Sequence, residues 1–342
     1  MKKYISLLVL VSTFAAFPSY AQTSGFHLFK KTIIGGEGGW DYLYADSQSR
    51  RLYVSHGDQV EVRDLDSHNS IGIIPNTKGV HGIYTAPEIG RGFITNGKAN
   101  TVTIFDLNTL KSIMEVPAGQ NPDALLYDKF SGRVFIFNND SKDITVIEAT
   151  SGKVVATFSV GGNPEAGVSD DKGVIFVNVE DTNEVVSFDA KTLVIRNQWK
   201  LAPGEEPNGL VLDKESHRIF SACRKSQTMI MLDSDNGKII AQVPIGKGVD
   251  GVILDQQNKL IITSNGEGTL TVIHEDSPTQ LSVVETVTTE PGARTMTFDA
   301  KSHHVFLSAA KYGAPPAATP DNPHPWPSVV SGTFMILEYG RK

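Results

Sequence analysis

Polar residues recur through this 342-residue sequence at a nearly constant spacing. Each lies one or two positions after a glycine or proline at the end of a loop, and each precedes an apolar run. Successive members lie 40, 42, 42, 43, 42 and 44 residues apart, a drift too small for chance. We call them the marker residues: Asp41, His81, Asp123, Glu165, Asn208, Asp250 and Arg294.

The marker residues could hold a cation if the fold gathers them. Four of the seven are carboxylates, which repel one another unless a positive charge compensates, and Arg294 supplies one such charge. Two imidazoles with one or two carboxylates form a donor set suited to divalent transition metals. His56 and His81, with Asp41 and Asp123 beside them, are therefore the candidate metal ligands. The alternative is that each histidine only makes hydrogen bonds.

A second apolar run in each repeat ends 15 positions after the marker, or 13 in the fourth repeat. Asparagine recurs at this end and often bonds loop backbone in Asx-type turns, so a ligand-binding role and a structural role both stay open. Cys223 is either a nucleophile or soft metal ligand, or a shielded small residue. The run-end residues are His56, Asn96, Asn138, Asn178, Cys223, Asn265 and Ala309.

The elements that must position these residues are short strands. Each repeat has four runs rich in β-branched and aromatic residues, separated by turns such as Asn236-Gly237-Lys238. Helical periodicity over ten or more residues is absent. The sequence therefore predicts an all-β, seven-bladed β-propeller with four strands per blade. Because first strands line the channel of a propeller, we expect marker and run-end residues to face one funnel at the channel mouth.

The two ends of the chain complete one blade between them. The seventh repeat stops after its third run, Phe334 to Leu337, and lacks a fourth. Phe26 to Gly35 matches the missing run. We therefore expect the N-terminal strand to join the last blade and close the ring, which removes open sheet edges.

The second runs, such as Phe93-Ile94-Thr95-Asn96, resemble the Tyr-Val-Thr-Asn repeat of YVTN-type β-propellers. About residues 26–340 as a whole resemble the periplasmic YncE-like branch of that family. The resemblance implies the propeller fold and the compartment but no chemistry, because related propellers include binding modules, lactonases, lyases and dehydrogenase subunits. Blades 1, 5 and 7 depart from the motif at His56, Cys223 and Ala309.

Blade 7 carries an insertion at about residues 311–331, on the expected channel-mouth face. Six of the 17 prolines fall between Pro315 and Pro327, which makes the segment extended and stiff. With Tyr312 and Trp326 it is a candidate lid or docking strip. The alternative is a tolerated surface insertion.

Residues 1–21 have the features of a signal peptide. A basic start at Lys2 and Lys3 precedes the apolar stretch Ile5 to Phe17, and Ser19-Tyr20-Ala21 fits a cleavage site. No later stretch is apolar for long enough to span a bilayer. We therefore expect residues 22–342 to form a single domain that is periplasmic or secreted.

The composition and the absence of known catalytic motifs exclude several classes of function. A formal charge of −7 disfavours nucleic acid as a partner, and a single cysteine excludes a disulfide framework. The Gly-x-Ser-x-Gly and His-Glu-x-x-His motifs are absent. We therefore predict a soluble, monomeric binding protein that presents the funnel to a small ligand, metal ion or protein partner. The main alternative is a metal-assisted lactonase- or lyase-like enzyme, followed by a purely structural protein. A divalent metal ion is the only cofactor candidate.

Overall fold

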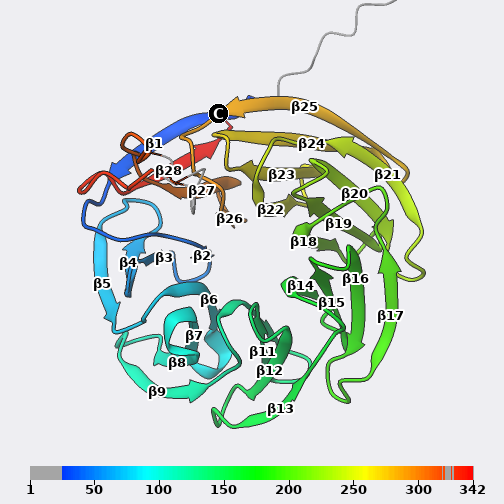
Figure 1. Cartoon of the computed structure of the whole chain (residues 1–342), viewed down its shortest axis with the longest axis horizontal. Helices are drawn as coiled ribbons and strands as arrows, with labels where there is room; N and C mark the ends of the chain where they lie inside the picture. The colour runs from blue at the N-terminus through cyan, green and yellow to red at the C-terminus, as the bar shows by residue number, and fades with distance from the viewer. Residues whose placement is uncertain (1–24, 318, 320–324, 326, 342) are drawn as a thin grey trace, which may run out of the picture.

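The computed structural model describes residues 25–317, 319, 325 and 327–341. Within this range the chain forms seven antiparallel four-stranded sheets arranged as a ring (Figure 1). The prediction of an all-β, seven-bladed β-propeller is confirmed. The predicted signal peptide and Trp326 lie outside the described residues.

Blades 1 to 4 follow one another along the chain, each running from the channel to the rim. Blade 1 consists of β2 (Leu43–Asp46), β3 (Arg51–His56), β4 (Gln59–Asp64) and β5 (Ser70–Pro75). Blade 2 consists of β6 (Val80–Ala86), β7 (Arg91–Asn96), β8 (Thr101–Asp106) and β9 (Ser112–Pro117). Blade 3 consists of β10 (Pro122–Asp128), β11 (Arg133–Asn138), β12 (Asp143–Glu148) and β13 (Val154–Phe158). Blade 4 consists of β14 (Pro164–Ser169), β15 (Val174–Val179), β16 (Glu184–Asp189) and β17 (Ile195–Lys200).

Blades 5 and 6 repeat this order, and blade 7 combines both ends of the described chain. Blade 5 consists of β18 (Pro207–Asp213), β19 (Arg218–Cys223), β20 (Thr228–Asp233) and β21 (Ile239–Pro244). Blade 6 consists of β22 (Val249–Asp255), β23 (Leu260–Asn265), β24 (Thr269–Ser277) and β25 (Gln280–Thr288). Blade 7 consists of β26 (Met296–Asp299), β27 (His304–Ala309), β28 (Met335–Gly340) and β1 (His27–Ile33).

Short 3-10 turns are the only helical elements in the described part of the chain, η1 (Pro87–Ile89) and η2 (Gly97–Ala99). Among these same residues no helix is long and apolar enough to cross a membrane.

The ring closes as predicted, through the N-terminal strand. β1 pairs antiparallel with β28, with Thr32 opposite Ile336 and Ile33 opposite Met335. The Ile34 amide continues the ladder by donating to the Phe334 carbonyl at 2.8 Å. Closure in this way gives the third strand of blade 7 an outer partner, as the other blades have.

Acidic residues at the ends of the third strands form the outer turns. In blade 2, Asp106 Oδ1 accepts the amide of Asn108 at 3.1 Å and the amide of Thr109 at 2.8 Å. The next residue, Leu110, has a φ of 59° and donates its amide to the Asp106 carbonyl at 2.9 Å. The recurring acid–turn pattern in the sequence is therefore an Asx-type turn that leads into the rim strand.

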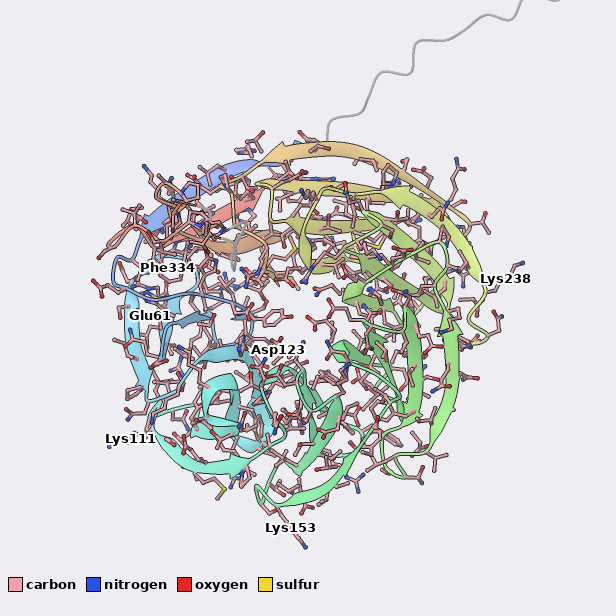
Figure 2. The ribbon with its side chains drawn as sticks, viewed as in Figure 1. Glu61, Lys111, Asp123, Lys153, Lys238 and Phe334 are labelled. Atoms are coloured by element: carbon pink, nitrogen blue, oxygen red, sulfur yellow. The ribbon has the colours of Figure 1, made fainter. Side chains whose placement is uncertain are left out.

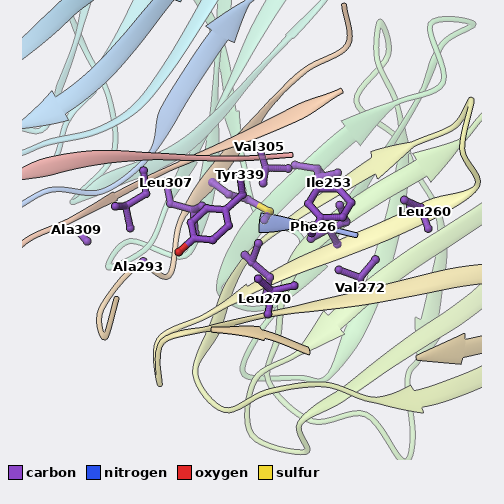
Figure 3. Close-up of a cluster of buried hydrophobic side chains, with 14 of the residues drawn as sticks. Phe26, Ile253, Leu260, Leu270, Val272, Ala293, Val305, Leu307, Ala309 and Tyr339 are labelled. Carbon is purple, nitrogen blue, oxygen red and sulfur yellow. The ribbon is translucent and has the colours of Figure 1, made fainter. Parts of the chain in front are cut away.

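Apolar side chains fill the spaces between neighbouring blades. Figure 3 shows the cluster between blades 6 and 7, where Leu270 and Val272 of β24 pack near Tyr339 of β28. Glycine follows the marker in three blades because blades approach closely there. A Cβ at Gly82 would lie 2.4 Å from Cδ2 of Leu125 in the next blade. These contacts hold the first strands, and hence the marker residues, in a rigid ring.

Candidate functional site: the channel mouth

Hydroxyl side chains hold the marker residues in place across blade boundaries. The Thr95 hydroxyl, at the end of β7, accepts the Gly82 amide at 2.7 Å and donates to the Asp123 carbonyl of the next blade at 2.5 Å. In blade 6 the equivalent residue, Ser264, donates its hydroxyl to the Arg294 carbonyl of blade 7. In blades 2 and 6 the residue before the run end therefore links neighbouring blades. A hydroxyl recurs at this position in four of the seven repeats, but the repeat pattern alone does not predict the link.

Three marker residues from consecutive blades come together at one side of the mouth. His81 Nδ1 lies 2.6 Å from Asp41 Oδ2 and 3.7 Å from Asp123 Oδ1. One ligand atom from each residue falls within 4.8 Å of the other two. Asp41 is buried, whereas His81 and Asp123 are partly exposed. We call this group the marker trio; its donor set is one imidazole nitrogen and two carboxylate oxygens.

The pKa values of His81 and Asp123 are both raised. Burial lowers the pKa of His81, but the hydrogen bond to Asp41 and the charge of Asp123 outweigh it and leave the pKa raised. Burial, with the nearby charge of Asp41, raises the pKa of Asp123 to about 7. The trio therefore takes up protons near neutral pH when it holds no cation.

The opposite part of the ring carries two guanidinium groups. Asp250 Oδ2 accepts from Arg294 Nε at 2.5 Å, and Asp250 Oδ1 accepts from Arg224 Nη2 at 2.6 Å. Arg294 also lies 3.8 Å from Asp41 through Nη2, which connects this pair to the trio. Arg224 is not among the site residues predicted from the sequence, where its one signal is the position directly after the run-end residue Cys223.

Glu165 and Asn208 form the remaining part of the ring. Asn208 Nδ2 donates to Glu165 Oε1 at 3.0 Å, and both side chains are buried. Burial, followed by the charges of Asp123 and Asp250, raises the pKa of Glu165 well above its ordinary value. All seven predicted marker residues thus lie in one network or next to it, as their common place in the blades requires.

The run-end asparagines use their amides inside the fold. Asn96 Nδ2 donates to the hydroxyls of Thr101 and Thr103 at 3.0 and 2.8 Å. Asn265 repeats this pattern with Thr269 and Thr271. The partners are hydroxyls on the neighbouring third strand, not the loop backbone of an Asx-type turn.

Two further asparagines vary this arrangement. Asn138 donates to Asp143 and Thr145, at the same strand positions as in blade 2. Asn178 instead donates to the carbonyls of Asn208 and Gly209 in the next blade, at 2.9 and 3.1 Å. All four run-end asparagines are fully buried.

Cys223 packs within the protein. Its thiol is buried in the apolar cluster of blades 4 and 5, with the Ser221 carbonyl 3.8 Å from Sγ. A Cβ at Gly204 would lie 2.6 Å from the same sulfur. Burial raises the pKa of the thiol to about 12, so the reactive thiolate is disfavoured. Of the two interpretations of Cys223, this environment favours the shielded residue.

His56 does not join the marker trio. Its ring stacks on Phe334 with centroids 4.2 Å apart, and its Nδ1 lies 3.8 Å from Glu61 Oε1. Figure 2 places Asp123 at the inner edge of the ring, whereas Glu61 and Phe334 lie farther out. Of the four predicted metal ligands, Asp41, His81 and Asp123 therefore lie together, whereas His56 lies apart from them.

The start of the blade 7 insertion lies beside the ring. Tyr312 pairs with Val329 in an isolated β-bridge, and its ring lies 5.9 Å from that of Trp40. Its hydroxyl region packs against Gly292, where a Cβ would lie 2.6 Å from the phenol oxygen. Tyr312 is thus near Arg294, while the other predicted lid residue, Trp326, falls outside the described residues.

Comparisons with known proteins report on the fold. No family model and no curated protein matches the chain. A chain in the crystal structure of a mitotic checkpoint complex superposes on it with a TM-score of 0.74 at 12% identity, covering 100% of this chain and 99% of that one. At this identity the likeness shows the β-propeller architecture alone, so the resemblance to YVTN-type and YncE-like proteins stays a prediction.

Proposed function

We propose that this protein is a periplasmic binding propeller that holds a divalent transition-metal ion at Asp41, His81 and Asp123. The observation that carries the proposal is the geometry of the marker trio. Three donor atoms from three blades lie within 4.8 Å of one another at the channel mouth. One nitrogen and two carboxylate oxygens suit zinc, nickel or manganese better than a purely oxygen-liganded ion such as calcium.

Charge supports the same conclusion. Asp123 and Asp41 face each other across His81, and neither has an arginine at hydrogen-bond distance. Asp250, in contrast, already receives two guanidinium groups. A divalent ion at the trio would compensate the charge of its two carboxylates, whereas the arginine side of the ring already has two cations.

Thermal shift with a panel of metals tests the proposal. Zinc, nickel or manganese should raise the melting temperature, by an amount that corresponds to about 2.7 kcal/mol at a hundred times the dissociation constant. The variants His81→Asn and Asp123→Asn should each reduce the rise by the share that the channel-mouth ion contributes. His217→Asn, at an exposed histidine beside Asp235, is the matched control and should keep it. A melting temperature that no metal moves would rule the ion out.

The enzymatic alternative uses the same ion. A channel space of about 250 Å³ lies next to the trio and is lined by the residues that follow its three members, Tyr42, Gly82 and Ala124. A small lactone in this space could have its carbonyl polarised by the ion. Metal-dependent hydrolysis by the wild type that disappears in His81→Asn would favour the enzyme; binding of metal without turnover of any lactone would favour the binding protein.

A further inference from the structure

Blade 1 departs from the arrangement that blades 2 and 6 share at the run end. In β7–β8 and β23–β24 the run-end asparagine bonds two threonine hydroxyls on the next strand. The corresponding positions of β3–β4 hold His56, Gln59 and Glu61, because His56 pairs with Gln59 as Asn96 pairs with Thr101. An imidazole, an amide and a carboxylate thus replace an amide and two hydroxyls.

His56 lacks the hydrogen bonds that its burial requires. The residue is only 4% exposed, and neither ring nitrogen has a hydrogen-bond partner among the described residues. Its ring is held between Phe334 and the backbone of Gly36, where a Cβ would lie 2.6 Å from Cε1. A buried polar group without a partner is costly, so a ligand that bonds either ring nitrogen would stabilise the protein.

A polar cavity of about 330 Å³ lies against this histidine. Glu61 faces the imidazole with 3.8 Å between Oε1 and Nδ1, too long for a hydrogen bond. Two ligand atoms of one tetrahedral zinc ion lie about 3.4 Å apart, so a small shift would let both bind the same ion. Glu61 is itself oriented by Gln59 at 3.0 Å and Arg63 at 3.2 Å. The cavity is lined by Gly36, Glu37, His56, Asp58, Gln59 and Glu61, among other residues.

We propose that His56 and Glu61 hold a second divalent transition-metal ion, distinct from the one at the channel mouth. The site lies where the ring closes: residues after β1 cross over His56, and the Gly36 carbonyl accepts the Gly332 amide at 3.0 Å. Glu37 and Asp58 also line the cavity, where Asp58 Oδ1 accepts the Gly79 amide at 2.9 Å, so water would supply the remaining ligands of the ion. An ion here would tie the closing segment to blade 1.

Counting bound ions tests this site independently of the channel mouth. Native mass spectrometry of the purified chain with zinc should show two ions in the wild type. His56→Asn should remove one, His81→Asn the other, and the double variant both. His217→Asn should leave both in place. Asparagine is chosen at position 56 because four other blades carry it there.

The variant in which a bound ion is lost shows which of the two sites exists. One wild-type ion that disappears only with His81→Asn would overturn the His56 site and leave the channel-mouth ion standing. One ion that disappears only with His56→Asn would do the reverse. Should His56→Asn fail to fold by circular dichroism, Glu61→Gln replaces it: we expect a zinc affinity at the second site at least tenfold weaker. Unchanged affinity in that variant would also overturn the site.

Discussion

His81 Nδ1 lies 2.6 Å from Asp41 Oδ2, so blades 1 and 2 meet at the channel mouth through an imidazole–carboxylate pair. Asp41 is held from its other side by Thr295 of blade 7, whose hydroxyl donates to its carbonyl. The pair therefore lies at the junction of three blades, next to the ring closure. Its geometry depends on the ring being closed, and this makes closure the first property to test.

Deleting residues 26–34 should abolish cooperative unfolding. These residues supply β1, and without it β28 exposes an unpaired edge and the cluster around Phe26 and Tyr339 opens. We expect aggregation or a broad melt in differential scanning calorimetry. A monomeric protein with an unchanged melting temperature would contradict the assignment of β1 to blade 7.

Shortening the blade 7 insertion should leave the fold intact. Replacing residues 314–327 by a short glycine–serine linker keeps Tyr312 and Val329, which pair at the base of the segment. We expect a change in unfolding free energy within about 0.5 kcal/mol, as for other surface changes. If the segment is a lid, the association rate of zinc at the channel mouth should rise in stopped-flow measurements; an unchanged rate would favour a tolerated insertion.

The stability of the metal-free protein should fall as the pH rises from about 5 to 8. The raised pKa of His81 means that its favourable contribution, complete below its unfolded pKa, is lost as the pH passes its folded pKa. Asp123, with a pKa of about 7, acts in the same direction, because the folded protein keeps a proton that the unfolded chain has already released.

Melting curves in chelator across this pH range measure the effect. Asp123→Asn should flatten the dependence, because asparagine carries no proton to lose, and His81→Asn should flatten it too. Saturating zinc should also reduce the slope, since the ion replaces the proton as the compensating charge. A melting temperature that rises steadily with pH in the metal-free wild type would contradict the direction of both shifts.

Asn96→Ala should destabilise the protein by about 1–3 kcal/mol, because it leaves the hydroxyls of Thr101 and Thr103 without their buried amide donor. Urea denaturation measures the loss, and Asn69→Ala, at an exposed turn, should change stability by less than about 0.5 kcal/mol. Zinc stoichiometry should stay the same. Unchanged stability with altered metal binding would instead make Asn96 a ligand residue.

The architecture could be predicted from the sequence because blades 1 to 6 are each formed by consecutive residues of the chain. The repeat spacing and the turn residues therefore predict the number of blades and of strands in each blade. The incomplete seventh repeat predicts that residues 26–34 close the ring. The marker residues shared one ring for the same reason: equivalent positions in equivalent units face the same end of the channel. Asp41, His81 and Asp123 are neighbours in space because their blades are neighbours in the chain.

Only the tertiary structure separated His56 from His81. Marker and run-end residues lie on different strands of a blade, and the spacing along the chain does not reveal how far each side chain lies from the channel axis. Stacking on Phe334, 278 positions away, draws His56 outward. The register between β7 and β8 likewise decided that Asn96 meets two threonines, and Arg224 reached Asp250 only because blades 5 and 6 pack together. These partners come from contacts between strands and blades, which the repeat alone does not encode.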